Sequence, residues 1–260
     1  MKGKKIMTVL AWALCLAAGV QAQQTEVIAH RGYWKTEGSA QNSLTALVKA
    51  DGIGCYGSEF DVWLTADDRL VVNHDTKFKG VTPEEATERV CTSVVLDNGE
   101  QLPTLKQYLQ IGKALKTKLV LEFKVSKLSE ERQTLGVEKI VALVKEMGLE
   151  ERTEYIAFSL HATKEFIRLA PKGTPVYYLN GDLSPQALKE IGAAGPDYHH
   201  SVFKKNPTWI KQCHDLGMKV NAWTVNDAET MQWLIREQAD FITTNEPELL
   251  QQVISEEKKK

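Results

Sequence analysis

The feature of this chain that most constrains its fold is a repeated alternation of short apolar runs with segments whose apolar residues recur at helical spacing. The runs that predict strands are residues 26–29, 58–62 together with 70–73, 118–123, 155–159, 175–178, 197–199, 219–223 and 240–242. About eight strand–helix units without an internal linker predict one α/β domain, a closed (β/α)8 TIM barrel. A doubly wound open parallel sheet is the alternative architecture.

Three pairs of residues mark expected helix starts. Proline is favoured at the first helical position, because the amide hydrogen it lacks would have no partner there. The pairs are Ser184-Pro185, Asn206-Pro207 and Glu246-Pro247. The sequence therefore predicts that a helix begins at each of them.

The N-terminal segment resembles a secretory signal peptide. Lysines stand at positions 2, 4 and 5, an apolar run follows, and Val20-Gln21-Ala22 offers small residues for cleavage. We therefore expect residues 1–22 to be a signal peptide and residues 23–260 to form the working domain. The protein should be exported, either to a periplasm or to the outside of the cell, without stable insertion in the membrane, because the apolar run is short for a bilayer span.

Lipid anchoring at Cys15 is the alternative fate of this segment. It is disfavoured because Leu14 is large where a small residue is expected, and because the cysteine lies inside the apolar run.

The charge of the chain argues against a nucleic-acid partner. The full sequence has a formal net charge of −2, and removal of residues 1–22 takes away three lysines and no acidic residue, which gives −5. A mildly acidic protein lacks the basic surface that binds phosphate backbones. We expect a small-molecule partner, and the sequence leaves the oligomeric state open.

The three remaining cysteines, Cys55, Cys91 and Cys213, are too few and too widely spaced for a disulfide framework or a zinc site. The preferred interpretation is three small buried apolar side chains, with one disulfide as the alternative.

Acidic residues lie at or near the ends of two predicted strands. Glu59 and Asp61 share one face of a strand because side chains alternate. Side-by-side carboxylates repel each other, and a hard divalent cation is the usual remedy. Glu122, at the end of another apolar run, would supply a third oxygen ligand. The sequence thus favours a site for Ca²⁺ or Mg²⁺, and surface ion pairs with lysines are the alternative.

Two histidines also fall at strand ends. Cleavage of a phosphodiester needs a base for the attacking oxygen and an acid for the departing one, and histidine suits both roles near neutral pH. His30 and His74 are the candidates, and Arg31 can bind phosphate oxygens with its planar fork. Each histidine alone could equally be a structural hydrogen-bonding group.

The ordered motifs of the chain resemble those of the glycerophosphodiester phosphodiesterase family over nearly the whole mature sequence. They are His30-Arg31-Gly32, Asn42, Glu59-Phe60-Asp61, Thr65, Asp67, Val71-Val72, His74-Asp75, Pro103-Thr104-Leu105, Leu121-Glu122-Phe123-Lys124, Trp223-Thr224-Val225-Asn226 and Ile242-Thr243-Thr244-Asn245-Glu246-Pro247.

The resemblance implies a TIM barrel with a short insertion after the second strand, in which a divalent cation and two histidines hydrolyse glycerophosphodiesters to glycerol 3-phosphate and an alcohol. Carried over by position, it implies Glu59, Asp61 and Glu122 as metal ligands, His30 and His74 as acid and base, Arg31 and Lys124 as phosphate-binding residues, and Trp223 as a wall of the substrate pocket.

Two features depart from the family pattern. Ala40-Gln41-Asn42-Ser43 stands where the family usually has Pro-Glu-Asn-Thr, so a carboxylate is replaced by an amide at Gln41. The segment 76–102 is also short for the lobe that shapes the substrate pocket in this family.

Two other functions stay open from sequence. One is a related exported phospholipase C or D type of barrel that acts on intact lipid or on a headgroup, which an exposed apolar rim would support. The other is a non-catalytic binding protein, for which Gln41 is the best evidence. Both histidines and all three carboxylates are present, which favours the enzyme.

Overall fold

The computed structural model describes residues 24–259, so the expected signal peptide lies outside the described residues. Eight parallel strands close into a barrel because β1 pairs with both β2 and β9. The barrel strands are β1 Glu26–Ala29, β2 Gly57–Leu64, β4 Lys118–Phe123, β5 Thr153–Ala157, β6 Val176–Tyr178, β7 Gly195–His199, β8 Asn221–Trp223 and β9 Phe241–Thr244. The predicted (β/α)8 TIM barrel is confirmed, and the open sheet is wrong.

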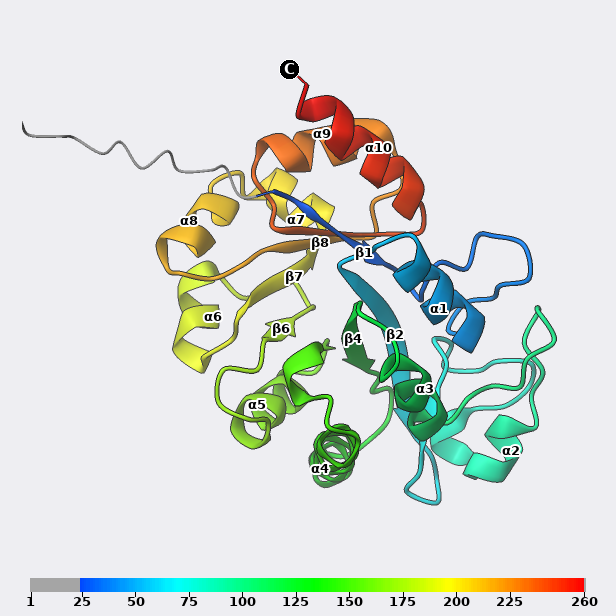
Figure 1. Ribbon diagram of the computed structural model, residues 1–260. Coiled ribbons are helices and arrows are strands. Elements are labelled where there is room, and N and C mark those ends of the chain that lie inside the picture. The colour runs from blue at the N-terminus through cyan, green and yellow to red at the C-terminus, as the bar shows by residue number, and fades with distance from the viewer. Residues whose placement is uncertain (1–23, 260) are drawn as a thin grey trace, which may run out of the picture.

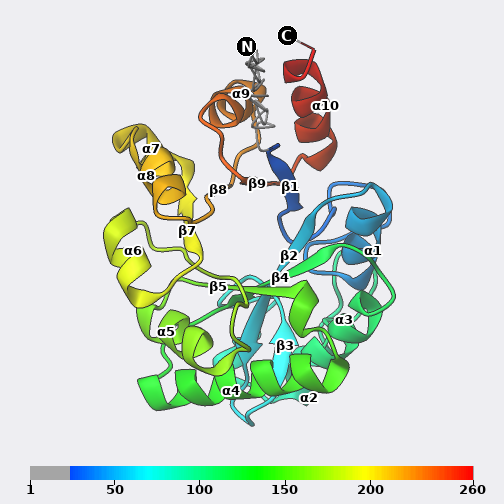
Figure 2. The same ribbon diagram turned by 60° about the vertical axis from the view of Figure 1, so that its left-hand side comes forward.

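Helices surround the barrel as an outer ring (Figures 1 and 2). They are α1 Leu44–Gly52, α2 Glu88–Thr92, α3 Leu105–Gly112, α4 Glu130–Met147, α5 Leu160–Leu169, α6 Pro185–Ile191, α7 His200–Lys205, α8 Trp209–Asp215, α9 Ala228–Arg236 and α10 Pro247–Glu257, with 3₁₀ turns at Pro83–Glu85 and Glu150–Arg152. None of the described helices is long and apolar enough to cross a bilayer.

The expected helix starts are confirmed at Pro185 and Pro247 and are wrong at Asn206-Pro207. The backbone amide of Asn206 donates to Val202 and Phe203, so this residue closes α7. The next helix, α8, begins at Trp209 after Thr208. A good N-cap residue type therefore closes the preceding helix here instead of opening the next.

The barrel interior is filled by side chains, which leaves room for a site only at its mouth. Ile28, Val120, Ile156, Tyr177 and Phe241, from five different strands, are buried against one another. In such a barrel the ligand-binding end is the one at which the strands terminate in the carboxyl direction. The structure therefore places the candidate site at the mouth of the barrel, around the carboxyl ends of the strands.

The insertion after the second barrel strand is short and has its own small core. It contains β3 Leu70–Val72, which pairs antiparallel with β2, and the helix α2. Trp63 and Val71 pack with Cys91, Leu96 and Leu102 in this core. The insertion thus forms a wall beside the mouth of the barrel and not a separate domain.

The cysteine prediction is confirmed. Cys55, Cys91 and Cys213 are free and buried, and burial raises the pKa of each thiol, to about 12 for Cys55 and Cys213 and about 11 for Cys91. They are inert parts of the core.

Candidate active site

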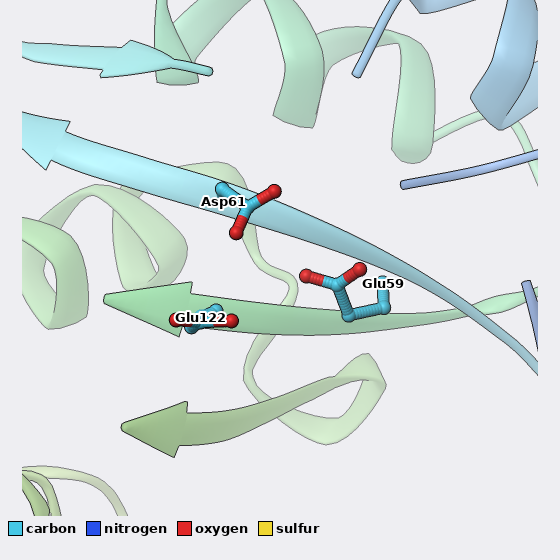
Figure 3. Close-up of side chains that lie close together, drawn as sticks. All are labelled: Glu59, Asp61 and Glu122. Carbon is cyan, nitrogen blue, oxygen red and sulfur yellow. The ribbon is translucent and has the colours of Figure 1, made fainter. Parts of the chain in front are cut away.

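Three carboxylates meet at the mouth of the barrel. Glu59 and Asp61 extend from β2, and Glu122 extends from the neighbouring β4, where it pairs in register with Asp61 (Figure 3). One oxygen of each lies within 4.8 Å of the others. All three side chains are buried. The alternation along β2 predicted that Glu59 and Asp61 share a face, and the register between the strands adds Glu122.

Burial makes this cluster electrostatically costly. It raises the pKa of Glu59 well above its ordinary value, helped by the charges of Asp61 and Glu122, and raises the pKa of Glu122 to about 7. Burial would raise the pKa of Asp61 as well, but Lys124, His74, Arg31 and Asn42 outweigh it and lower that pKa. Oε1 of Glu59 is buried without a hydrogen-bond partner. A cation would satisfy that oxygen, and the all-oxygen donor set suits a hard divalent ion.

Lys124 is the cationic side chain within the cluster. Its Nζ lies 2.8 Å from Oε1 of Glu122 and 3.5 Å from Oδ1 of Asp61. Burial would lower the pKa of Lys124, but these carboxylates outweigh it and raise the pKa. The lysine therefore stays charged beside the carboxylates, at the edge of the pocket where an anion would bind.

A tight turn after β1 directs Arg31 toward the cluster. Arg31 and Gly32 both have left-handed backbones, with φ of 58° and 76°. The turn points the amide of Arg31 at Oε2 of Glu59, 2.8 Å away. A β-carbon on Gly32 would lie 2.7 Å from the backbone carbon of Ala46 in α1. The glycine of the His-Arg-Gly motif is therefore required both by the backbone angle and by the close approach of the helix.

Asn42 and Gln41 hold the cluster and the arginine in place. The side chain of Asn42 donates to Oδ2 of Asp61 at 2.9 Å and accepts from the amide of Asp61 at 3.1 Å. Nη1 of Arg31 donates to Oε1 of Gln41 at 2.5 Å. The amide at position 41 thus orients the guanidinium without adding a negative charge.

The hydrogen bonds of His30 fix its tautomer. Oδ1 of Asn245 accepts from the indole nitrogen of Trp34 at 3.2 Å and lies 2.8 Å from Nδ1 of His30. The indole can only donate, so the Asn245 atom must be the oxygen and Nδ1 of His30 must carry a hydrogen. Burial and the Arg31 charge lower the pKa of His30 to about 4. The neutral ring then presents an unprotonated Nε2, 3.9 Å from Oε2 of Glu59.

His74 stands on the loop after β3 and is held by its neighbours. The amide of Asn73 donates to the Asp61 carbonyl at 3.0 Å, which ties the loop to β2. Nδ1 of His74 lies 2.9 Å from Oδ1 of Asp75, a carboxylate that can only accept when ionised. Nδ1 therefore donates to Asp75, and Nε2 is the nitrogen left for a substrate.

Two hollows share His74 as a common wall. The inner hollow, about 110 Å³, is lined by His30, Arg31, Glu59, His74, Glu122, Lys124, Ile156, Phe158, Leu179, Asp197, Trp223, Thr224 and Thr243. The outer hollow, about 430 Å³, lies between His74 and the insertion and is lined by residues that include Trp34, Gln41, Phe78 and Leu96. A substrate that spans both hollows would have its scissile bond beside His74.

The structure brings all eight predicted site residues together: seven line the inner hollow, and Asp61 lies buried beneath it. Trp223 lines the hollow, and its indole nitrogen donates to the Asp197 carbonyl at 2.8 Å. His199 has a structural contact, since its Nδ1 accepts from the Ser201 amide at the start of α7. His161, at the start of α5, lies outside the site and bonds Thr134 of α4 through Nε2.

Sequence reasoning missed two residues at the site. Asn245, which fixes the His30 tautomer, lies in the motif after the last strand, where the sequence alone does not indicate its contact with His30. Asp197 ends up buried in the inner hollow, and burial raises its pKa to about 8. The sequence signal that could have identified Asp197 is an acidic residue within a predicted barrel strand.

Comparison with known proteins agrees with this arrangement. The model of the glycerophosphoryl diester phosphodiesterase family matches residues 30–249. A glycerophosphodiester phosphodiesterase of Caldanaerobacter subterraneus is 27% identical over 241 residues, which cover 87% of this chain and 96% of that protein.

Solved structures show the same barrel. A glycerophosphodiester phosphodiesterase from Parabacteroides distasonis is 50% identical, with a TM-score of 0.88 over 91% of this chain and 99% of that chain. A phosphodiesterase from Oleispira antarctica, solved with the product sn-glycerol-3-phosphate, shares the fold at 23% identity, with a TM-score of 0.76 over 89% of this chain and 97% of that chain.

The raised pKa of Glu122 predicts how stability depends on pH when a chelator is present. Because its pKa rises from 4.5 to about 7 on folding, its contribution is fully present below about pH 4.5 and is lost as the pH rises through 7. The side chain introduced by Glu122→Gln cannot ionise. The melting temperature of this variant should therefore rise relative to that of the wild type as the pH increases from 5 to 8. Thermal denaturation with the exposed-site variant Glu146→Gln as control measures this. A difference that stays constant with pH would contradict the electrostatic account of the cluster.

Proposed function

The chain belongs to the glycerophosphoryl diester phosphodiesterase family, and from that premise we propose that it cleaves glycerophosphodiesters to glycerol 3-phosphate and an alcohol, using a divalent cation and two histidines. As a member of this family it is a phosphoric diester hydrolase. The observation that carries the proposal is one small hollow walled by two histidines, an arginine and a lysine over three buried carboxylates. The phosphodiesterase of Oleispira antarctica binds sn-glycerol-3-phosphate, the product expected here.

Glu59, Asp61 and Glu122 would hold the cation, for which Ca²⁺ and Mg²⁺ are the candidates. The fit is supported by the unpartnered Oε1 of Glu59 and by a donor set made only of oxygens. When bound, such an ion offsets negative charge on phosphoryl oxygens. Arg31 and Lys124, on two sides of the cluster, would bind those oxygens directly.

We assign the base to His30 and the acid to His74. His30 lines only the inner hollow and presents an unprotonated Nε2 there, so it suits proton removal from the nucleophile, either water or the neighbouring glycerol hydroxyl. His74 borders both hollows, and because its Nδ1 donates to Asp75, its Nε2 is the nitrogen left to face the leaving oxygen. With glycerol in the inner hollow and the alcohol in the outer one, the bond from phosphorus to the leaving oxygen breaks beside His74, which gives that oxygen its proton.

The accessible surface favours a small diester over an intact lipid. Among residues 24–259 the exposed large apolar side chains are Val48, Val90, Val95 and Phe158, and of these only Phe158 lines either hollow. A phospholipase that acts on intact lipid would need a continuous apolar rim at the mouth.

The first test of the function measures hydrolysis and its dependence on metal together. We expect glycerophosphocholine, glycerophosphoethanolamine or glycerophosphoinositol to be cleaved to glycerol 3-phosphate, with chelation abolishing the reaction and Ca²⁺ or Mg²⁺ restoring it. Glu59→Gln should lower turnover by roughly two orders of magnitude or more, because a ligand is lost, whereas Glu146→Gln should not. Full activity in protein shown by elemental analysis to be metal-free would exclude the metal role, and cleavage of phosphatidylcholine vesicles alone would favour the phospholipase.

The second test separates the two histidines. His30→Ala and His74→Ala should each lower turnover of glycerophosphocholine by roughly two to four powers of ten. A 4-nitrophenyl leaving group needs little protonation, so glycerol 4-nitrophenyl phosphodiester should rescue His74→Ala and not His30→Ala. Rescue of His30→Ala and not of His74→Ala would instead make His30 the acid and His74 the base. Near wild-type turnover in both folded variants would exclude the acid–base assignment and favour a binding protein.

Export remains a proposal that rests on residues 1–22. The mature chain should begin at or near Gln23 and lie outside the cytoplasm. Mass spectrometry of the protein from fractionated cells measures this. Intact Met1 on cytoplasmic protein, or a lipid on Cys15 in the membrane fraction, would contradict it.

A further inference from the structure

The inner hollow has a second polar region, on the wall formed by the last three strands of the barrel. Asp197 on β7 lines the hollow but is only 2% exposed, and its Oδ1 has no hydrogen-bond partner. Asp197 pairs in register with Asn221 on β8, and Nδ2 of Asn221 donates to Oγ1 of Thr243 on β9 at 2.8 Å. Oδ1 of Asn221 is also buried without a partner. Unsatisfied oxygens in a buried site call for a group that donates hydrogen bonds.

The position of Asp197 argues against a role at the phosphate. The carboxylates that could share a cation come from β2 and β4, and Asp197 is not among them. Asp197 offers a phosphate no positive charge, whereas Arg31 and Lys124, which follow β1 and β4, attract one. Asp197 thus lies where the uncharged part of a substrate would reach once its phosphate is bound beside the carboxylate cluster.

The remaining walls suit a small carbon skeleton. Ile156 and Leu179 provide apolar surface between the two polar regions, and Trp223 lines the hollow, its indole nitrogen donating to the Asp197 carbonyl. The hollow has a volume of about 110 Å³. That space suits a short polyol.

We propose that Asp197 is a specificity residue that accepts a hydrogen bond from the terminal hydroxyl of the glycerol moiety, the one farther from the phosphorus. The inference rests on the proposed function for the placement of glycerol. The hydroxyl adjacent to the phosphate stays near His30, and the terminal one reaches across the hollow to β7. A buried acceptor left unpaired when the hydroxyl is missing discriminates strongly against the shorter analogue.

Binding of the two phosphate monoesters tests this without turnover. In the presence of Ca²⁺ or Mg²⁺, isothermal titration calorimetry should show sn-glycerol 3-phosphate binding to the wild type on the order of 10- to 100-fold more tightly than the 1-phosphate of 1,2-propanediol, which lacks only the terminal hydroxyl. Asp197→Asn and Asp197→Ser should reduce this ratio severalfold. Asp182→Asn, an exposed acid on the loop after β6, should leave the ratio unchanged.

Turnover provides the second readout. On a glycerophosphodiester the Asp197 variants should lose kcat/KM severalfold, and on the matching diester of 1,2-propanediol, which lacks only the terminal hydroxyl, their loss relative to the wild type should be much smaller. Equal affinity of the wild type for the two monoesters, or an unchanged ratio in both folded Asp197 variants, would overturn the role of Asp197. Absence of glycerophosphodiester hydrolysis by the wild type would instead contradict the proposed function, so the two failures are distinguishable.

Discussion

Repulsion among three buried carboxylates is the constraint on which the rest of the site depends. Glu59, Asp61 and Glu122 meet only because β2 and β4 pair with Asp61 opposite Glu122. A slip of one residue would turn one set of acids away from the barrel mouth, since side chains alternate along a strand. The neighbouring groups reduce the repulsion: Lys124 pairs with two of the carboxylates, and the Arg31 amide bonds the third. The closed barrel supplies the rigidity that keeps like charges together.

The sequence was sufficient to predict that the site residues lie near the ends of strands. The alternation of strands and helices predicted the barrel. Acids and histidines near the ends of different strands were therefore expected to meet at one end of it. The orientations were not predictable. The left-handed turn at Arg31 depends on a backbone angle, and the hydrogen bond that His30 donates to Asn245 joins residues 215 positions apart. Local periodicity carries no information on which rings and amides face each other across a barrel.

The error at Asn206 and the omission of Asp197 have different causes. Asn206 has a good N-cap side chain, but its backbone amide and its side-chain amide both donate to carbonyls of α7, so it closes that helix. Asp197 looked like an ordinary polar residue in a short strand. Its burial follows from closure of the barrel, which brings β7 to face β2 and β4 across the mouth. The burial of Asp197 thus depends on contacts between strands that are distant in sequence, which propensity does not encode.

The amide at position 41 alters the charge balance without losing the geometry. A glutamate there, as the family usually has, would add a fourth acid beside the cluster and neutralise Arg31. Gln41 keeps the hydrogen bond to Nη1 of Arg31 and leaves the charge of the guanidinium to face Asp61, whose Oδ2 lies 3.9 Å from Nε. The more positive site should bind a phosphate more readily and a cation less readily than one with glutamate. Both effects act through the guanidinium of Arg31. Glutamine in place of glutamate at position 41 therefore strengthens phosphate binding relative to cation binding and preserves the arrangement of the reacting groups.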